Sequence, residues 1–163
     1  MLGLVGCSSK KGPELFFASG YVADQGINRL WREDSARHEP QTILNVYSPY
    51  YGGDTIITRY EFQQGQLHLI KETHATKTDL GVMLRFDEAG NVSFMQRQLP
   101  ERREKLSSDE IERYKYEASK ILDLSNALQA GNVRLVQARW RKGLITTCAG
   151  EQVTPALTVR SQV

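Results

Sequence analysis

The 163-residue chain has few cysteines and histidines, two residue types that are common in metal sites and catalytic centres. It holds two cysteines and three histidines, with no paired-cysteine or histidine-rich motif; neither a metal nor a cofactor is predicted. A phosphate loop, a dinucleotide fingerprint and a Gly-x-Ser-x-Gly elbow are also missing, so we expect no enzyme activity. A net charge of +2 does not indicate a nucleic-acid partner. No apolar run approaches the roughly 18 residues of a membrane-spanning helix, so a soluble body is expected.

The N-terminus carries the pattern around which the rest of the chain is interpreted. Residues 4–7 read Leu-Val-Gly-Cys and two serines follow. This is the form of a bacterial lipobox, with Cys7 as the lipidated residue that would attach the protein to a membrane. Only residues 1–6 precede it, without a lysine or arginine, and they are interpreted as the remnant of a signal peptide that starts upstream. Residues 7–15 then form a lipid-anchored linker. The alternative is a buried N-terminal strand with a structural cysteine.

A lipid on Cys7 would leave Cys148 unpaired, which is unusual in an oxidising compartment. Three explanations stay open: a buried inert thiol, an intermolecular disulfide, or a partner cysteine beyond the end of this chain. Residues 158–163 read like a strand that the end of the chain cuts short. Between the linker and this tail, residues 16–157 are predicted to form a single domain of one antiparallel sheet and one helix.

Alternating apolar and polar residues predict successive β-hairpins in the first two thirds of the chain. Val82, Leu84 and Phe86, for example, fall on one face of a predicted strand. Turns that contain glycine separate several of the strands. The predicted strands cover residues 18–24, 27–33, 42–47, 55–62, 66–74, 80–86 and 92–99, and a charged connector follows at 100–105.

Residues 107–130 predict one long amphipathic helix. Ser107 and Glu110 have the spacing of a capping box, and Gly131 is the expected stop. A further hairpin is predicted within residues 133–148. The predicted fold class is therefore α+β, mainly β: an antiparallel meander sheet, curled or partly closed, with the helix packed on one face. The apolar stripe of the helix consists of Ile111, Tyr114, Ala118, Ile121, Leu122 and Leu128.

The first candidate binding surface is a tyrosine-rich loop near Pro49. Tyr47, Tyr50 and Tyr51 offer rigid aromatic area with polar tips, which suits a glycan or a protein partner. The alternative is that these rings fold back and cover the end of the sheet.

The second candidate surface is formed by Arg139, Trp140 and Arg141 at the tip of the last hairpin. Such a patch would meet phosphate-bearing lipid headgroups or an acidic protein. The alternative, a solvated turn near balancing glutamates, is favoured by composition. Three further arginines are candidates to extend the patch: Arg97, Arg102 and Arg103.

Two of the three histidines have a spacing that could serve a metal site. A straight strand would place His68, Glu72 and His74 on one face, because their numbers differ by even steps. No ligand-rich motif surrounds them, so ordinary strand histidines are the favoured interpretation.

Several short segments resemble an uncharacterised family of small Gram-negative envelope lipoproteins, classed as a domain of unknown function. The resemblance extends from Cys7 to about Pro155. It implies a secreted lipoprotein, with Ser8 favouring sorting to the outer membrane, and it implies no activity, substrate or ligand. The segments that carry it are residues 18–21, 24–26, 93–97, 106–109 and 146–150.

We therefore expect a non-catalytic outer-membrane lipoprotein that faces the periplasm and binds an envelope component or protein partner. Its membrane contact would be the lipid on Cys7, since several acyl chains give stable attachment. One alternative is a carrier of a small apolar ligand or lipid inside a curled sheet. Another is an unrecognised hydrolase, which would need a histidine beside a nucleophile.

Overall fold

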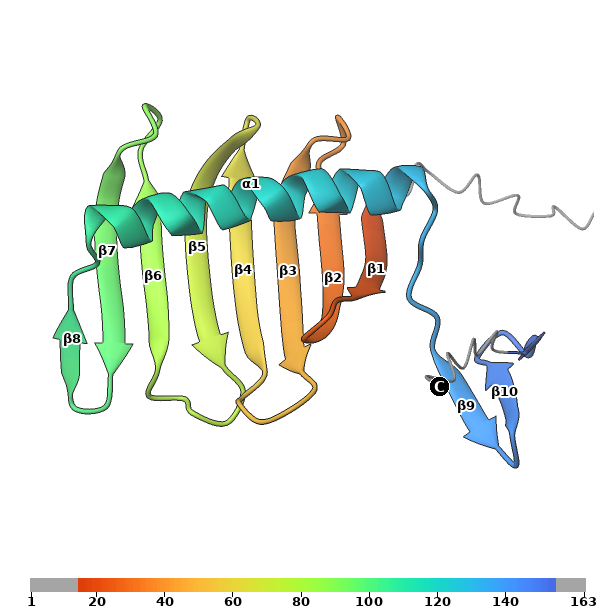
Figure 1. Cartoon of the computed structure of the whole chain (residues 1–163). Helices are drawn as coiled ribbons and strands as arrows, with labels where there is room; N and C mark the ends of the chain where they lie inside the picture. The colour runs from red at the N-terminus through yellow and green to blue at the C-terminus, as the bar shows by residue number, and fades with distance from the viewer. Residues whose placement is uncertain (1–14, 155–163) are drawn as a thin grey trace, which may run out of the picture.

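The computed structural model describes residues 15–154, which form a large sheet, one long helix and a small sheet (Figure 1). Cys7 and the tail 158–163 lie outside this range. The eight strands of the large sheet pair antiparallel in chain order, which confirms the predicted meander. They are β1 (Phe16–Val22), β2 (Gly26–Asp34), β3 (Pro40–Pro49), β4 (Ile56–Gln63), β5 (Gln66–His74), β6 (Gly81–Phe86), β7 (Val92–Leu99) and β8 (Arg102–Glu104).

The large sheet is open. β1 and β8 form its two edges and do not pair with each other, so the closure allowed for by the sequence does not occur. β8 lies within residues 100–105, which the sequence indicated as a connector. Its three residues pair with the end of β7. β8 is too short and too charged for an alternating pattern to be recognised in the sequence.

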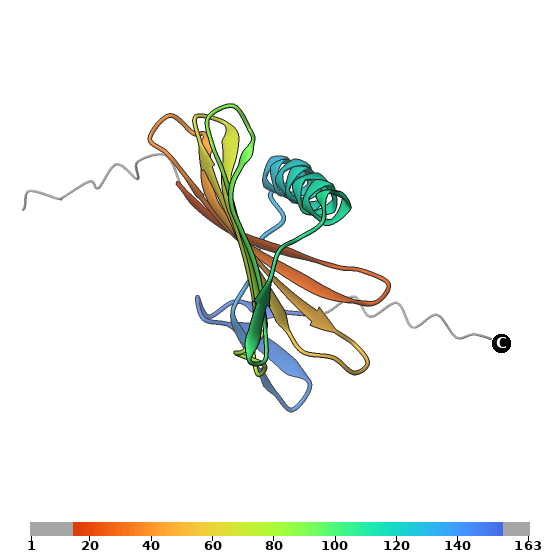
Figure 2. The ribbon, with the colours of Figure 1, turned by 90° about the vertical axis from the view of Figure 1, so that its left-hand side faces the viewer.

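α1 (Ser108–Ala130) begins and ends where the sequence predicts. The hydroxyl of Ser107 accepts a hydrogen bond from the Glu110 backbone, the Glu110 carboxylate accepts one from Ser107, and Gly131 caps the C-terminal end. The helix runs across the strands and covers one face of the sheet only (Figures 1 and 2). Within residues 15–154, no helix has the length and apolar character needed to cross a membrane.

The core lies between α1 and the sheet face beneath it. Every second residue of a strand points to this face, as Leu30 and Arg32 do on β2, while Trp31 points to the other side. The alternation predicted for β6 is confirmed, because its three apolar residues are all buried. The core cluster consists of Leu30, Ile43, Tyr60, Phe62, Ile70, Val82, Leu84, Phe86, Leu106, Ile111, Tyr114, Ala118 and Ile121.

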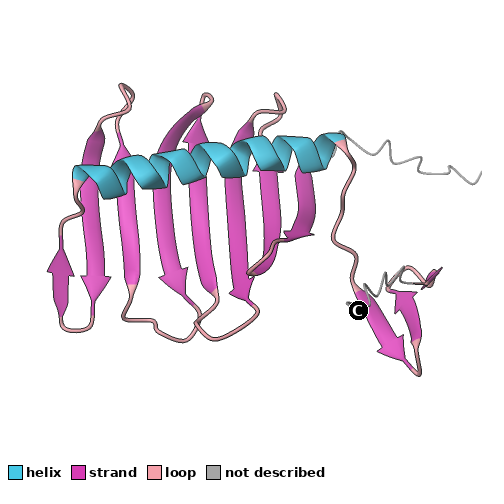
Figure 3. Cartoon of the chain, viewed as in Figure 1, coloured by secondary structure: helices cyan, strands magenta, loops and turns pink. Residues whose placement is uncertain are grey.

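The hairpin predicted after the helix forms, but in a separate three-stranded sheet: β9 (Ala138–Arg141), β10 (Leu144–Thr147) and β11 (Gln152–Val153). The small sheet lies beyond β1, on the side where α1 ends (Figures 1 and 3). Between α1 and β9, the backbone N–H of Leu135 donates to the carbonyl of Ala18 in β1, so the segment 131–137 takes up part of this sheet edge. Cys148 is exposed, so its interpretation as a buried thiol is wrong.

Candidate functional site

A cavity of about 410 Å³ lies between α1 and the sheet. We call it the groove. Its volume falls within the roughly 300–1,000 Å³ of small-molecule sites. Its floor and walls combine tyrosine rings, aliphatic side chains and a few polar groups. The sheet contributes Tyr21, Asn45 and Tyr60, and the helix contributes Glu117, Lys120, Ile121 and Leu124.

The groove arises because two neighbouring rows of residues on the helix-facing side differ in character. One row, which includes Ile43, Tyr60 and Ile70 on adjacent strands, packs beneath α1. The next row is interrupted by polar residues, because Asn45 and Thr58 lie at paired positions between Leu30 on β2 and Glu72 on β5. Apolar side chains therefore hold the helix on the first row, and the groove lies beside the polar positions of the second row.

Asn45 supplies the most informative polar atom of the groove. Its Oδ1 is buried and has no hydrogen-bond partner among the residues that the structure describes. An unpaired buried acceptor costs about 1–3 kcal/mol. A ligand that donates a hydrogen bond to this atom would remove that cost.

Burial and negative charge keep the tyrosines near the groove protonated. The pKa of Tyr60 is raised, first by burial and then by the carboxylates of Glu117 and Glu72. The hydroxyl of Tyr114 donates to Glu72 Oε1 at 3.3 Å, and burial also raises its pKa. Burial raises the pKa of Glu72 as well. Both phenols therefore stay neutral, and the Tyr114 hydroxyl is already used by Glu72.

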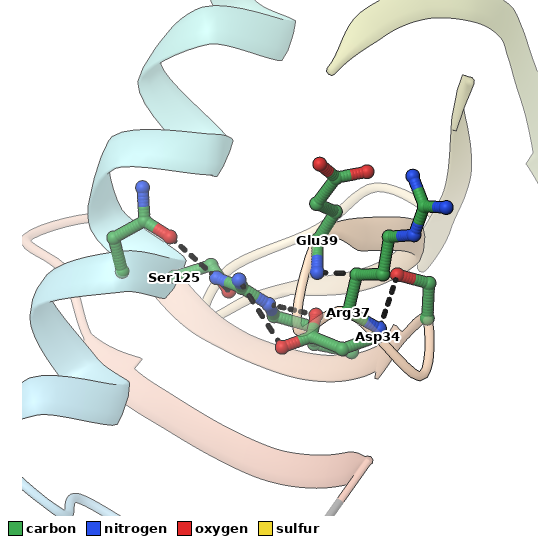
Figure 4. Close-up of polar contacts among 7 residues, drawn as sticks. Asp34, Arg37, Glu39 and Ser125 are labelled. Carbon is green, nitrogen blue, oxygen red and sulfur yellow. Dashed lines mark hydrogen bonds and ion pairs between the residues drawn. The ribbon is translucent and has the colours of Figure 1, made fainter. Parts of the chain in front are cut away.

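A buried polar cluster fixes the C-terminal half of α1 to β2 (Figure 4). Arg32 is 4% exposed, and its Nε donates to Asp34 Oδ1 at 2.6 Å. Its Nη1 donates to Ser125 Oγ at 3.3 Å and to Asn126 Oδ1 at 2.5 Å on the helix. Our sequence reasoning missed this cluster, although its signal was present: Leu30, Arg32 and Asp34 share one face of a strand.

The structure separates the three tyrosines of the first predicted surface. Tyr47 folds back, because its hydroxyl donates to the carbonyl of Gln25 at 3.3 Å. Tyr50 and Tyr51 lie in the loop after β3, with ring centroids 6.4 Å apart. Tyr51 is 93% exposed. Only the latter two therefore form an accessible aromatic pair.

The second predicted surface is also divided. Arg139, Trp140 and Arg141 are exposed on β9. Since side chains alternate along a strand, Trp140 lies on one face of the small sheet and the two arginines on the other. The predicted extension is wrong, because its three arginines lie on β7 and β8, at the edge of the large sheet farthest from β1 in strand order.

Comparison with known proteins gives a family. Residues 18–163 match the family model described as "Protein of unknown function (DUF1481)". The chain belongs to this family. It is similar to an uncharacterized protein of Escherichia coli (strain K12), YjaH, with 38% identity over 156 residues, which is 94% of this chain and 67% of the relative. No solved structure matches. The predicted resemblance to a family of unknown function is thus confirmed, and the lipoprotein assignment stays a prediction.

The histidines of this DUF1481 protein do not come together. His68 and His74 lie near opposite ends of β5, about 20 Å apart at the rise of a strand, and His38 lies in the turn after β2. No group of three or more metal-binding side chains occurs within residues 15–154. In that range no histidine side chain forms a hydrogen bond with a serine, threonine or cysteine. The groove, in contrast, brings aliphatic groups, aromatic groups and an unpaired polar group together at one site.

Proposed function

We propose that this DUF1481 protein is a non-catalytic, lipid-anchored binding protein that faces the periplasm from the outer membrane and holds an envelope component in the groove beneath α1. The observation that carries the binding proposal is the groove itself, with the unpaired buried acceptor of Asn45. The lipobox at Cys7 supports the anchor, and Ser8 supports sorting to the outer membrane.

The lining of the groove indicates an amphipathic ligand. Ile121 and Leu124 provide an aliphatic wall, and the ring of Tyr60 provides a flat apolar surface. Asn45 Oδ1 requires a donor, such as an N–H or O–H group. A molecule with an apolar body and one hydrogen-bond donor satisfies both requirements.

The fluorescent probe N-phenyl-1-naphthylamine has these features, since it is uncharged, aromatic and carries a single N–H. We expect it to bind the full chain with saturable fluorescence enhancement. Leu124→Trp should abolish the enhancement by filling the groove, and Asn45→Leu should weaken binding about tenfold by removing the acceptor. Ser119→Trp is the matched control on an exposed helix position and should bind like the parent.

Equal probe binding by Leu124→Trp and the parent, with both proteins folded, would reject the groove as the binding site. The anchor has a separate test: the intact mass of the protein expressed from its native locus. We expect a mature N-terminus at Cys7 with acyl chains, in the membrane fraction. An unmodified N-terminus in the soluble fraction would reject the anchor and leave the groove proposal standing.

A further inference from the structure

The sheet face opposite α1 carries an excess of positive charge. Figure 2 shows that the helix lies on the other side of the sheet. The register assigns five basic and two acidic side chains to this face, whereas α1 carries five acidic and three basic residues. The basic residues are Arg29, Arg59, Lys71, Arg85 and Arg103, and the acidic ones are Glu33 and Glu61.

Three of these cations gather on the central strands β4, β5 and β6. Arg59 and Lys71 are directly paired across the strands, and like charges at paired positions destabilise a sheet. Glu61 compensates Arg59 through an ion pair of 2.8 Å. Lys71 and Arg85 form no ion pair among the described residues. We call Arg59, Lys71 and Arg85 the basic face.

Arg85 also has an aromatic neighbour. Its guanidinium lies 5.8 Å from the ring centroid of Phe94, which is 42% exposed. The basic face therefore presents long, flexible cations beside apolar area on an open sheet, and it does not line the groove. An arrangement that costs stability within the sheet would gain from an anionic partner that covers all three charges at once.

We propose that the basic face docks on an anionic membrane surface. Cations spread over a sheet face complement a plane of phosphate headgroups, and each basic residue near an acidic leaflet strengthens binding about fivefold. The choice of a membrane rests on the proposed anchor: eight residues separate Cys7 from Phe16, the first residue of β1, and span at most about 30 Å. A chain lipidated at Cys7 would thus hold the sheet close to headgroups.

The test uses the full chain with Cys7→Ala, so that no lipid contributes to binding. We expect it to sediment with vesicles of phosphatidylglycerol and phosphatidylcholine, less so at high salt, and not with phosphatidylcholine alone. Lys71→Gln with Arg85→Gln should weaken binding about 25-fold, at an unfolding temperature no lower than that of the parent. The matched control, Arg37→Gln with Lys77→Gln, removes the same charge from exposed turns and should stay within twofold of the parent.

Unchanged vesicle binding after loss of Lys71 and Arg85 would overturn the proposal, and so would an equal loss in the control pair. Retention of the Cys7→Ala chain by an acidic peptide or an oligonucleotide, without vesicle binding, would overturn it in favour of another polyanion. Because the tested chain has no anchor, its failure to bind vesicles says nothing against lipidation at Cys7. The groove variant Leu124→Trp should bind vesicles like the parent, which separates the two sites.

Discussion

The buried pair of Arg32 and Asp34 permits a quantitative test of how α1 is held on the sheet. Asp34→Ala would leave the guanidinium of Arg32, 4% exposed, with only the neutral acceptors of Ser125 and Asn126. Removing one partner of a buried ion pair costs about 3–5 kcal/mol. We expect a fall of that size in the free energy of unfolding, a large share of the 5–15 kcal/mol typical of a whole domain.

Removing both charges should recover most of the lost free energy of unfolding, because an apolar replacement of a buried pair is often neutral or stabilising. Arg32→Met with Asp34→Ala and Ser125→Ala eliminates the cation, the anion and the hydroxyl that would lose its donor. We expect the free energy of unfolding of this triple variant to lie within about 2 kcal/mol of that of the parent. Urea unfolding followed by tryptophan fluorescence, at a constant m-value, measures both changes. A loss below 1 kcal/mol for Asp34→Ala, or a triple variant as unstable as the single one, would refute the reasoning.

Three further predictions concern acid stability and backbone packing. A hydrogen bond from the Ser107 backbone lowers the pKa of Glu110 to about 2, so its stabilisation is complete above pH 4.5 and is lost as pH falls towards 2. In Glu110→Gln, the unfolding temperature should depend less on pH between 4.5 and 2 than it does in the parent. An unchanged pH dependence would contradict the capping contact. Burial raises the pKa of Glu72 above its ordinary 4.5, so ionisation destabilises the fold as pH rises beyond that value. Glu72→Gln should therefore unfold at a higher temperature than the parent at pH 7 and at the same temperature at pH 4, and a loss at pH 7 would argue against this. In Gly26→Ala, the new Cβ would lie 2.5 Å from the Ser48 carbonyl oxygen. We expect a loss of about 1–3 kcal/mol in urea unfolding, and no loss would mean that the hairpin shifts freely.

Local signals in the sequence were sufficient for the helix and for most of the strands. The capping box of Ser107 and Glu110 acts within one turn, so it could be recognised without knowledge of the fold. The alternation of Val82, Leu84 and Phe86 likewise follows from the period of a strand. These signals also indicated the order of the hairpins, because antiparallel neighbours joined by short turns pair with each other.

The remaining features depend on contacts between distant segments. The groove requires Asn45 of β3 and Leu124 of α1 to face each other, which neither local sequence indicates. From the sequence alone, Arg32 is expected at the surface. In the fold, Ser125 of α1 lies over it and accepts its hydrogen bond. The position of the small sheet follows from where α1 ends, and the open shape of the large sheet follows from the absence of pairing between its edge strands.

Native mass spectrometry of the protein, isolated from its own locus in mild detergent, tests the central claim most directly. We predict that the parent and Ser119→Trp each carry a bound small molecule, and that Leu124→Trp, with an unfolding temperature near that of the parent, carries none. Fragmentation of the complex would then identify the envelope component. A parent without any bound molecule, or an equally occupied Leu124→Trp, would contradict the proposal that the groove beneath α1 is a ligand site.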